Sequence, residues 1–316
     1  MTLITKLTQL FSKTASMDSL GICLQGTGLG YCLLPNKTEN SHTQSETSSD
    51  NSLYRKSIVS NMPLIKGGAV STLAQLLNQD NIQGQCQLVL QTGQYHLVQI
   101  NKPEVPVAEL HSALRWQIKE LVPISPENMV LDYFQGPNIN GNEQKINVVC
   151  ASKSELQAMV SQFEQDACQL TAITIPEFAF ANLLPYSDDA VLMVCQQPEE
   201  ELFILVVRQG RILFYRHLRG FVQVANKSEQ ELSFGVIDSL SLEIQKSSDY
   251  FERQLKQAAI SAIVVLAPGI NEAYLASKLA DNTNVPLTLL SLPDGVENKR
   301  NMAAAIGVTM PQKVAS

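Results

Sequence analysis

The residues best suited to chemistry lie in a glycine-containing turn near the start of the chain. Residues 20–34, LGICLQGTGLGYCLL, predict two strands joined by a tight turn. Backbone N–H groups in such a turn can hold a phosphate, because neighbouring amides form an anion-binding concavity. The residues concerned are Gly26, Thr27, Gly28 and Gly30. Most short glycine turns are purely structural, so a phosphate site and a plain hairpin both stay open.

Other groups that carry chemistry are sparse. Mg²⁺ prefers carboxylate and water ligands, and no Asp or Glu stands in this hairpin. The acidic run 199–201 is typical of a solvated turn. The four histidines share no metal-ligand spacing, and no GxSxG or Cys–His arrangement suggests a nucleophile. We therefore expect no catalytic residue and no metal site.

The six cysteines are scattered, and no pair has CxxC spacing. If the first turn is centred on Thr27 and Gly28, Cys23 lies opposite Cys32. We expect two buried free thiols there rather than a disulfide, because the chain carries no secretion signal and cytoplasmic thiols stay reduced.

Composition bounds the class of protein. The chain has 316 residues and a net charge of −7, which argues against nucleic-acid binding because phosphate recognition needs a basic surface. It has no signal peptide and no apolar run long enough to cross a bilayer, so we expect a cytoplasmic protein. Residues 2–16 form a short amphipathic pattern with Lys6 and Lys13. A frayed or self-docked terminus and a peripheral membrane or partner contact both stay open.

The most informative module is residues 110–134. Leu110, Leu114, Ile118 and Leu121 predict one helical stripe that ends before a proline, and residues 129–134 predict a strand. Trp116 lies off this stripe. It either packs against a second element or faces a partner as an anchor.

Periodicity predicts α/β structure along the rest of the chain. Helices are predicted over 64–77, 152–166, 177–184, 228–257 and 271–281. Ser247 and Ser248 are expected to interrupt the helix over 228–257. Strands are predicted over 145–152, 170–175, 190–195, 202–207, 211–217, 262–266 and 286–292. Residues 86–100 predict a second hairpin or a strand pair around Thr92 and Gly93. Residues 36–52 lack large apolar side chains and predict a disordered loop. Hairpins near 20 and 190 suggest two similar halves.

Residues 114–134, LRWQIKELVPISPENMVLDYF, resemble the inserted subdomain of the PilM-type, actin-like pilus assembly proteins. Within that family they are most similar to the branch of the mannose-sensitive haemagglutinin (MSHA) pilus. RQGRILFYR, SLSLEIQKSSDYFERQL and AAAIGV extend the resemblance over almost the whole chain. The resemblance implies an α/β, actin-like two-lobed fold with an inserted small α/β subdomain.

The resemblance also implies domain boundaries. They are an N-terminal amphipathic segment at 1–16, a first lobe at 17–103 with a disordered loop at 36–60, an inserted subdomain at 104–172, and a second lobe at 173–316.

The family binds ATP and Mg²⁺, and this chain departs from its motifs. Cys23 falls at the aspartate position of the first hairpin, Gln25 at a glycine position and Gly30 at a lysine position. The second phosphate hairpin falls near residues 195–198, which offer no carboxylate, and the adenosine loop keeps Gly269. We therefore expect a degenerate nucleotide site at the first turn and Gly269, without ATP hydrolysis.

By resemblance, the protein is a cytoplasmic scaffold of an inner-membrane type IV pilus platform. Its partner is the cytoplasmic tail of a PilN-like membrane protein, docked as an extended peptide in a groove beside the inserted subdomain. The module bordering that groove contains Leu110, Leu114 and Trp116. Two alternatives are an active nucleotide switch or ATPase of the same fold, and a cytoplasmic analogue of the type II secretion protein GspL.

Overall fold

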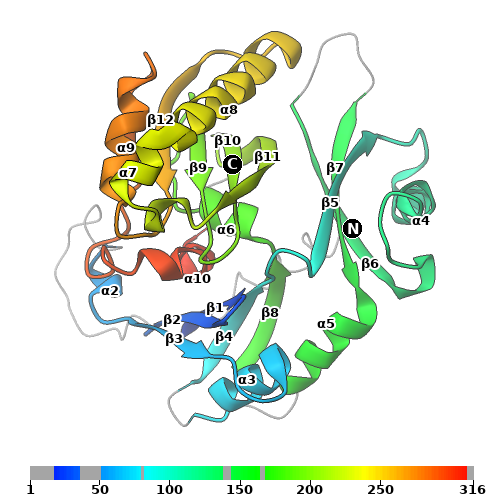
Figure 1. The fold of residues 1–316 in the computed structure, drawn as a ribbon. Coiled ribbons are helices and arrows are strands. Elements are labelled where there is room, and N and C mark those ends of the chain that lie inside the picture. Colours follow the sequence, from blue (N-terminus) through cyan, green and yellow to red (C-terminus); the bar gives the residue numbers. More distant parts are fainter. Residues whose placement is uncertain (1–17, 36–50, 80–81, 138–143, 164–167, 312–316) are drawn as a thin grey trace, which may run out of the picture.

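The computed structural model describes residues 18–35, 51–79, 82–137, 144–163 and 168–311. The predicted N-terminal amphipathic segment and residues 36–50 of the predicted loop lie outside this range. Two five-stranded sheets and one three-stranded sheet organise the described residues (Figure 1).

The first sheet has the strand order β3-β2-β1-β4-β8. A hairpin supplies its centre, and parallel strands extend it on one side. The strands are β1 Ser19–Gln25, β2 Gly28–Leu34, β3 Ile58–Pro63, β4 Gly84–Val89 and β8 Cys168–Thr174. Apolar residues of α3 Gly68–Leu77 and α5 Lys153–Val160 share a buried core with this sheet. The short helix α2 Asn51–Tyr54 precedes β3.

The second sheet repeats this arrangement in the order β11-β10-β9-β12-β13. Strand directions match one for one, because β9, β10 and β11 are antiparallel neighbours while β12 and β13 continue in parallel. The strands are β9 Ala190–Cys195, β10 Glu201–Arg208, β11 Arg211–Val222, β12 Ile260–Leu266 and β13 Leu287–Leu289. The helices α8 Ile237–Asp249 and α9 Glu272–Asp281 contribute to its outer core, and the short helix α7 Glu229–Glu231 precedes α8. The two predicted similar halves are therefore present.

Two helices lie between the sheets. They are α6 Pro176–Ala181 and α10 Ala303–Thr309, and they share one core with the inner faces of both sheets. A Cβ built on Gly307 of α10 would lie 2.0 Å from the carbonyl oxygen of Ala179 in α6. A Cβ on Gly21 of β1 would lie 2.1 Å from the carbonyl oxygen of Ala305. Glycine at both positions lets backbone approach backbone.

The inserted subdomain stands between β4 and β8 in the sequence. It consists of the sheet β5-β7-β6 and the helix α4 Val107–Ile118, and it has its own apolar core. The strands are β5 Tyr95–Asn101, β6 Met129–Gln135 and β7 Lys145–Ser152. Figure 1 shows it on one side of the molecule, apart from the outer helices of the second lobe.

The register of the first hairpin differs from the prediction. The turn is formed by Gly26 and Thr27, one residue earlier than expected, so Cys23 pairs with Gly30 and not with Cys32. Both thiols are buried and free, as predicted.

Residues 51–60 were predicted within the disordered loop, and this was wrong. They form α2 and the start of β3, and β3 pairs with β2 along its length. The alternation of Val59 with polar neighbours suits an edge strand that is buried on one face.

The predicted hairpin over 86–100 was also wrong. Its two strands exist, but β4 pairs with β1 and β8, whereas β5 pairs with β7 of the insert. The chain thus leaves the first sheet at residues 90–94. The expected boundaries at 103/104 and 172/173 placed β5 in the first lobe and β8 in the insert. In the structure β5 belongs to the sheet of the insert and β8 to the first sheet.

Two details of the predicted helices changed. The segment 228–257 breaks at Phe234 and Gly235, where Gly235 has a φ of 98°, and not at Ser247, which is buried within α8. Helix α4 ends at Ile118, so Leu121 leaves the predicted stripe and is exposed. None of the described helices is both long and apolar enough to cross a membrane.

The burial pattern of α4 gives a stability prediction. Leu114 is fully buried in the core of the insert, whereas Trp116 on the same helix is 59% exposed. We expect Leu114→Ala to lower the free energy of unfolding by about 2–5 kcal/mol, because it leaves a cavity. The matched variant Trp116→Ala should change it by about 0.5 kcal/mol or less. Urea unfolding followed by circular dichroism measures both, and equal losses would contradict the assigned faces of α4.

Candidate functional site: the cleft between the two lobes

The first turn faces the second lobe across a cleft. A cavity of about 540 Å³ lies there, and it is lined by both hairpins, by the loop after β12 and by residues 298–302. Thr27 and Gly269, two of the predicted nucleotide-binding residues, line it. The arrangement of the two lobes therefore brings Thr27 and Gly269 to one cavity, although they are more than 200 positions apart in the sequence.

Two of the four predicted amides of the first hairpin are already used by the sheet. β2 is an inner strand, and Gly28 pairs with Gln25 and Pro63 while Gly30 pairs with Cys23 and Asn61. The backbone groups of an inner strand bond to its neighbours on both sides. The turn residues Gly26 and Thr27 are left as the amides nearest the cleft.

At the predicted aspartate position, a thiol and an amide join the lobes directly. The Sγ of Cys23 donates a hydrogen bond to Oε1 of Gln197, with 2.7 Å between the atoms. Gln197 lies just after β9, where the second phosphate hairpin was placed from the sequence. Burial, together with the nearby charge of Glu200, raises the pKa of the Cys23 thiol well above its usual value. The contact is neutral and offers no carboxylate to a cation.

Side chains of the chain itself fill the predicted lysine position. A Cβ on Gly30 would lie 2.6 Å from Sδ of Met302 and 3.2 Å from Nε2 of Gln25. The same Nε2 donates to the carbonyl oxygen of Asn301 at 2.8 Å. A longer side chain at position 30 would have to displace both neighbours.

The charge beside the turn is negative. A Cβ on Gly26 would lie 3.2 Å from Oε2 of Glu199, a residue with the left-handed φ of 65°. The carboxylate of Glu199 therefore stands beside the amides that would hold a phosphate. Two negative groups at this separation repel each other.

The cation among the lining residues is neutralised. The guanidinium of Arg300 forms an ion pair with the carboxylate of Glu272, and it also donates to the carbonyl oxygens of Leu290 and Val265. Glu272 additionally accepts a hydrogen bond from the backbone N–H of Ala267 at 2.7 Å. Arg300 thus links β12 to the residue that follows β13, and its charge is paired with Glu272 and not with a ligand of the cavity.

Gly269 makes a close backbone contact. A Cβ there would lie 2.5 Å from the carbonyl carbon of Ala225. Close packing between two parts of the second lobe therefore explains why residue 269 is a glycine. Among the described residues, no group of three or more His, Cys, Asp or Glu side chains is placed to hold a metal ion.

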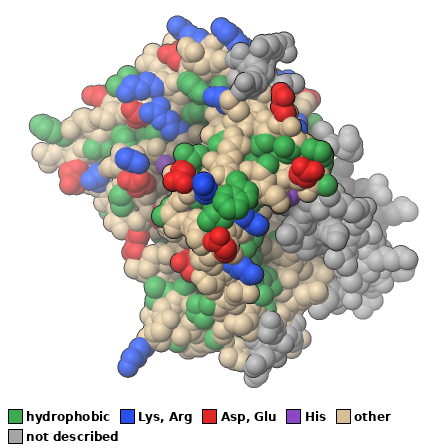
Figure 2. All heavy atoms as spheres, turned by 90° about the vertical axis from the view of Figure 1, so that its right-hand side faces the viewer, with side chains coloured by type: hydrophobic (Ala, Val, Ile, Leu, Met, Phe, Trp, Pro, Cys, Tyr) green, Lys and Arg blue, Asp and Glu red, His purple; other side chains and the backbone are tan. Residues whose placement is uncertain are grey.

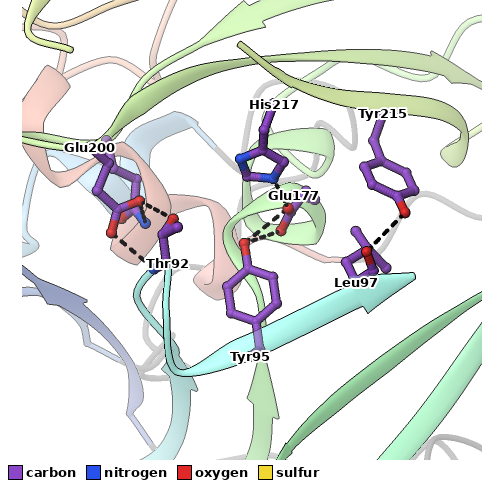
Figure 3. Close-up of polar contacts among 8 residues, drawn as sticks. Thr92, Tyr95, Leu97, Glu177, Glu200, Tyr215 and His217 are labelled. Atoms are coloured by element: carbon purple, nitrogen blue, oxygen red, sulfur yellow. Dashed lines mark hydrogen bonds and ion pairs between the residues drawn. The ribbon is translucent and has the colours of Figure 1, made fainter. Parts of the chain in front are cut away.

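A fully buried carboxylate lies at the other end of the interface between the lobes. The oxygens of Glu177, on α6, each accept from Oη of Tyr95 at 2.9 Å, and Oε1 lies 2.9 Å from Nε2 of His217 (Figure 3). Tyr95 begins β5 of the insert, and His217 lies on β11. One carboxylate therefore joins the helix between the sheets, the insert and the second sheet.

The electrostatics of His217 favour its charged form. Burial lowers its pKa, but the hydrogen bond and the charge of Glu177 outweigh this, with help from Glu200 and Glu201, so the pKa is raised. The imidazole also stacks on Phe203, with 5.3 Å between ring centroids. Burial and Glu177 raise the pKa of Tyr95 as well, which keeps its hydroxyl as a donor.

The acidic run 199–201 is not a plain solvated turn, as had been predicted. The carboxylate of Glu200 accepts from the backbone N–H of Thr92 at 3.0 Å, from Oγ1 of Thr92 at 2.6 Å and from Nε2 of Gln197 at 3.2 Å. Figure 3 shows this contact beside the Glu177 cluster, and it ties the second lobe to the connection between β4 and β5.

The residues predicted to border a partner groove divide into two groups. Leu110 and Leu114 are buried in the core of the insert, where a partner cannot reach them. Trp116 is exposed, so packing against a second element is the wrong alternative for it, and Nζ of Lys119 lies 5.4 Å from its ring centroid.

The buried cluster at Glu177 was missed by the sequence reasoning. The one signal was a glutamate inside the short apolar segment PEFAFA, since Glu is rarely buried unless it is paired. Its partners Tyr95 and His217 come from strands far away in the sequence, which periodicity cannot connect.

Comparisons with known proteins rest on structure. No family model matches this sequence, and no curated protein matches it. The structure of a PilM-PilN type IV pilus biogenesis complex is similar, with a TM-score of 0.64 and 18% identity over 93% of this chain and 97% of that chain. The cytoplasmic domain of EpsL, an inner membrane component of the type II secretion system of Vibrio cholerae, gives a TM-score of 0.47 and 11% identity over 93% of this chain and 96% of that chain. A Bacteroides thetaiotaomicron protein with an actin-like ATPase fold gives a TM-score of 0.48 and 9% identity over 91% of this chain and 96% of that chain.

The duplicated sheets, the two helices between them and the insert define the two-lobed α/β fold of the actin-like ATPases, as predicted. The version of the fold is that of PilM.

The Glu177–His217 pair gives a pH prediction. His217 has a higher pKa in the folded protein than the value of about 6.5 that it takes when unfolded. Its contribution to stability is therefore fully present below about pH 6.5 and is lost as the pH rises through the raised pKa. Thermal unfolding from pH 6 to 9 should show this loss in the wild type and not in His217→Gln. His96→Gln removes a histidine outside the cluster and should lose stability with pH as the wild type does. The same loss in His217→Gln would refute the assignment.

Proposed function

We propose that this chain is a cytoplasmic scaffold of the inner-membrane platform that assembles a type IV pilus of the MSHA kind. Its counterpart in that system would be MshI, and its partner the cytoplasmic tail of the PilN-like protein MshJ. The observation that carries the proposal is the likeness to PilM in a PilM-PilN complex, over nearly the full length of both chains. The resemblance of residues 114–134 to the MSHA branch supports it independently.

The insert offers the surface for this partner. Trp116, Val107 and Leu121 are exposed on or beside α4, and exposed aromatic residues often supply most of the energy of a protein interface. Figure 2 shows the side of the molecule that carries the insert, where hydrophobic side chains emerge among acidic and basic ones. The buried Leu110 and Leu114 hold the helix that presents them.

The mechanism in this proposal is binding rather than catalysis. The cleft does not hold ATP and Mg²⁺ in the manner of the family, and three features support this. Cys23 and Gln197 bond to each other where carboxylates are needed, the side chains of Met302 and Gln25 occupy the space beside Gly30, and Glu199 lies beside the turn. The protein would reach the inner membrane through its partner.

One observation favours the alternative of a nucleotide switch. The cavity of about 540 Å³ persists between the lobes and keeps Thr27 and Gly269 in its lining. A nucleotide would then be held by hydrogen bonds to amide side chains rather than through a metal ion.

Calorimetry with ATP, with and without Mg²⁺, separates these two proposals. We expect no binding at millimolar ATP, because the phosphates would meet the carboxylate of Glu199, and Arg300, the cation among the described residues that line the cavity, is paired with Glu272. PilM measured under the same conditions is the control. Tight binding of ATP would replace the scaffold by the nucleotide switch, and the comparison with and without Mg²⁺ would show whether a metal ion takes part.

The scaffold itself is tested with a synthetic peptide of the cytoplasmic tail of the PilN-like protein. We expect the wild type to bind it and Trp116→Ala to bind at least tenfold more weakly, measured by fluorescence anisotropy. Leu242→Ala, on α8 of the second lobe, is a matched control and should bind like the wild type. No binding by the wild type would overturn the scaffold, and full affinity in Trp116→Ala would remove Trp116 from the interface.

A further inference from the structure

The second lobe carries the two most exposed large hydrophobic side chains among the described residues. Phe234 is 90% exposed and Ile270 is 84% exposed. Scattered apolar residues at a surface are ordinary, but grouped ones mark interaction sites. The question is therefore whether these two belong to one surface.

Phe234 is held outward by a break in the backbone. The helical path between α7 and α8 is interrupted at Phe234, with φ −83° and ψ 46°, and at Gly235, with φ 98°. Glycine adopts a φ of 98° without the steric cost that a Cβ would bring, so Gly235 favours a break of the helical path at this position.

Ile270 lies on a segment that is bonded to this break. Ser233, next to Phe234, shares a hydrogen bond of 2.7 Å with Oη of Tyr274, one helical turn after Ile270. Nδ2 of Asn271 donates to the carbonyl oxygen of Lys227 at 2.8 Å. Figure 1 shows α7 and α9 on the same side of the second lobe, away from the insert. We call Phe234, Ile270 and their flanking residues the Phe234–Ile270 surface.

The charges that flank this surface are mainly negative. Near Phe234, Glu229, Glu231 and Asp238 are exposed carboxylates and Lys227 is a cation, while Lys278 on α9 is paired with Asp281. Hydrogen bonds from Ser228 lower the pKa of Glu231, so it stays ionised. An occupant that matches both features combines apolar side chains with lysine or arginine.

We propose that the Phe234–Ile270 surface binds the basic, apolar segment that directly precedes the transmembrane helix of the membrane partner. This rests on the proposed function and adds a second contact, distant from the insert. Cytoplasmic segments next to transmembrane helices are enriched in lysine and arginine, which gives the required charge.

The distance between the two contacts is within reach of one tail. A compact chain of this length is roughly 50 Å across, so a path over its surface between opposite sides is up to about 80 Å long. An extended segment of about 24 residues spans that path. One end of a tail can therefore lie on the insert while its membrane-proximal end lies on the second lobe.

A bare anionic lipid surface does not suit the same site, because its charge has the same sign as that of the flanking carboxylates.

The test uses the PilN-like protein, with its tail and transmembrane helix, in nanodiscs of uncharged lipid. The variant F234S/I270S should bind at least tenfold more weakly than the wild type. L242S, which changes a half-exposed leucine elsewhere on α8, should stay within twofold. The variant E229Q/D238N should associate more slowly and with a weaker dependence on salt. Because all of these side chains are at the surface, circular dichroism should show every variant folded.

A shortened tail peptide without its basic segment separates the two contacts. It should bind the wild type and F234S/I270S equally. If the nanodisc protein binds F234S/I270S as tightly as the wild type, this inference fails while the scaffold stands. If it does not bind the wild type at all, both fail. A wild-type dimer that F234S/I270S abolishes in light scattering would assign the surface to self-association and overturn the inference.

Discussion

The contact between α6 and α10 is the constraint on which the rest of the structure depends. The two helices fill the space between the sheets, and their backbones touch at Gly307 and Ala179. This position can accept no larger side chain, so it fixes the distance between the helices. The first sheet rests on α10 through Gly21, and the second sheet reaches α6 through His217 and Glu177. The cleft with its two hairpins is therefore built on a rigid base.

The sequence was sufficient to predict the parts of the fold that depend on local pattern. The strands of both hairpins and the buried residues of α4 follow from periodicity. Strand partners do not. The strands over 86–100 looked like a hairpin because they are adjacent, yet each is more stable in a different sheet. The break at Gly235 was overlooked because the apolar pattern continues on both sides of it.

The candidate site could be predicted in its motifs but not in what surrounds them. The resemblance to the family predicts Cys23 at an aspartate position and Gly30 at a lysine position. It could not show that Gln197 would bond to Cys23 or that Met302 would occupy the space beside Gly30, since these pairs lie 174 and 272 positions apart. Glu177 was hidden for the same reason. Side chains that are distant in the sequence meet only after the sheets have assembled, and no local pattern records the meeting.

The six buried thiols have a consequence beyond packing. Burial raises the pKa of most of them, to about 12 for Cys32 and about 11 for Cys150, whereas the thiolate is the form that reacts. Each folded layer thus keeps its thiols unreactive: Cys86 and Cys168 in the first sheet, Cys150 in the insert, and Cys23 and Cys195 between the lobes. The rate at which each one meets an alkylating reagent is set by how often its own layer opens. The alkylation rates of the native cysteines therefore report the opening of the lobes and of the insert separately, without an introduced probe.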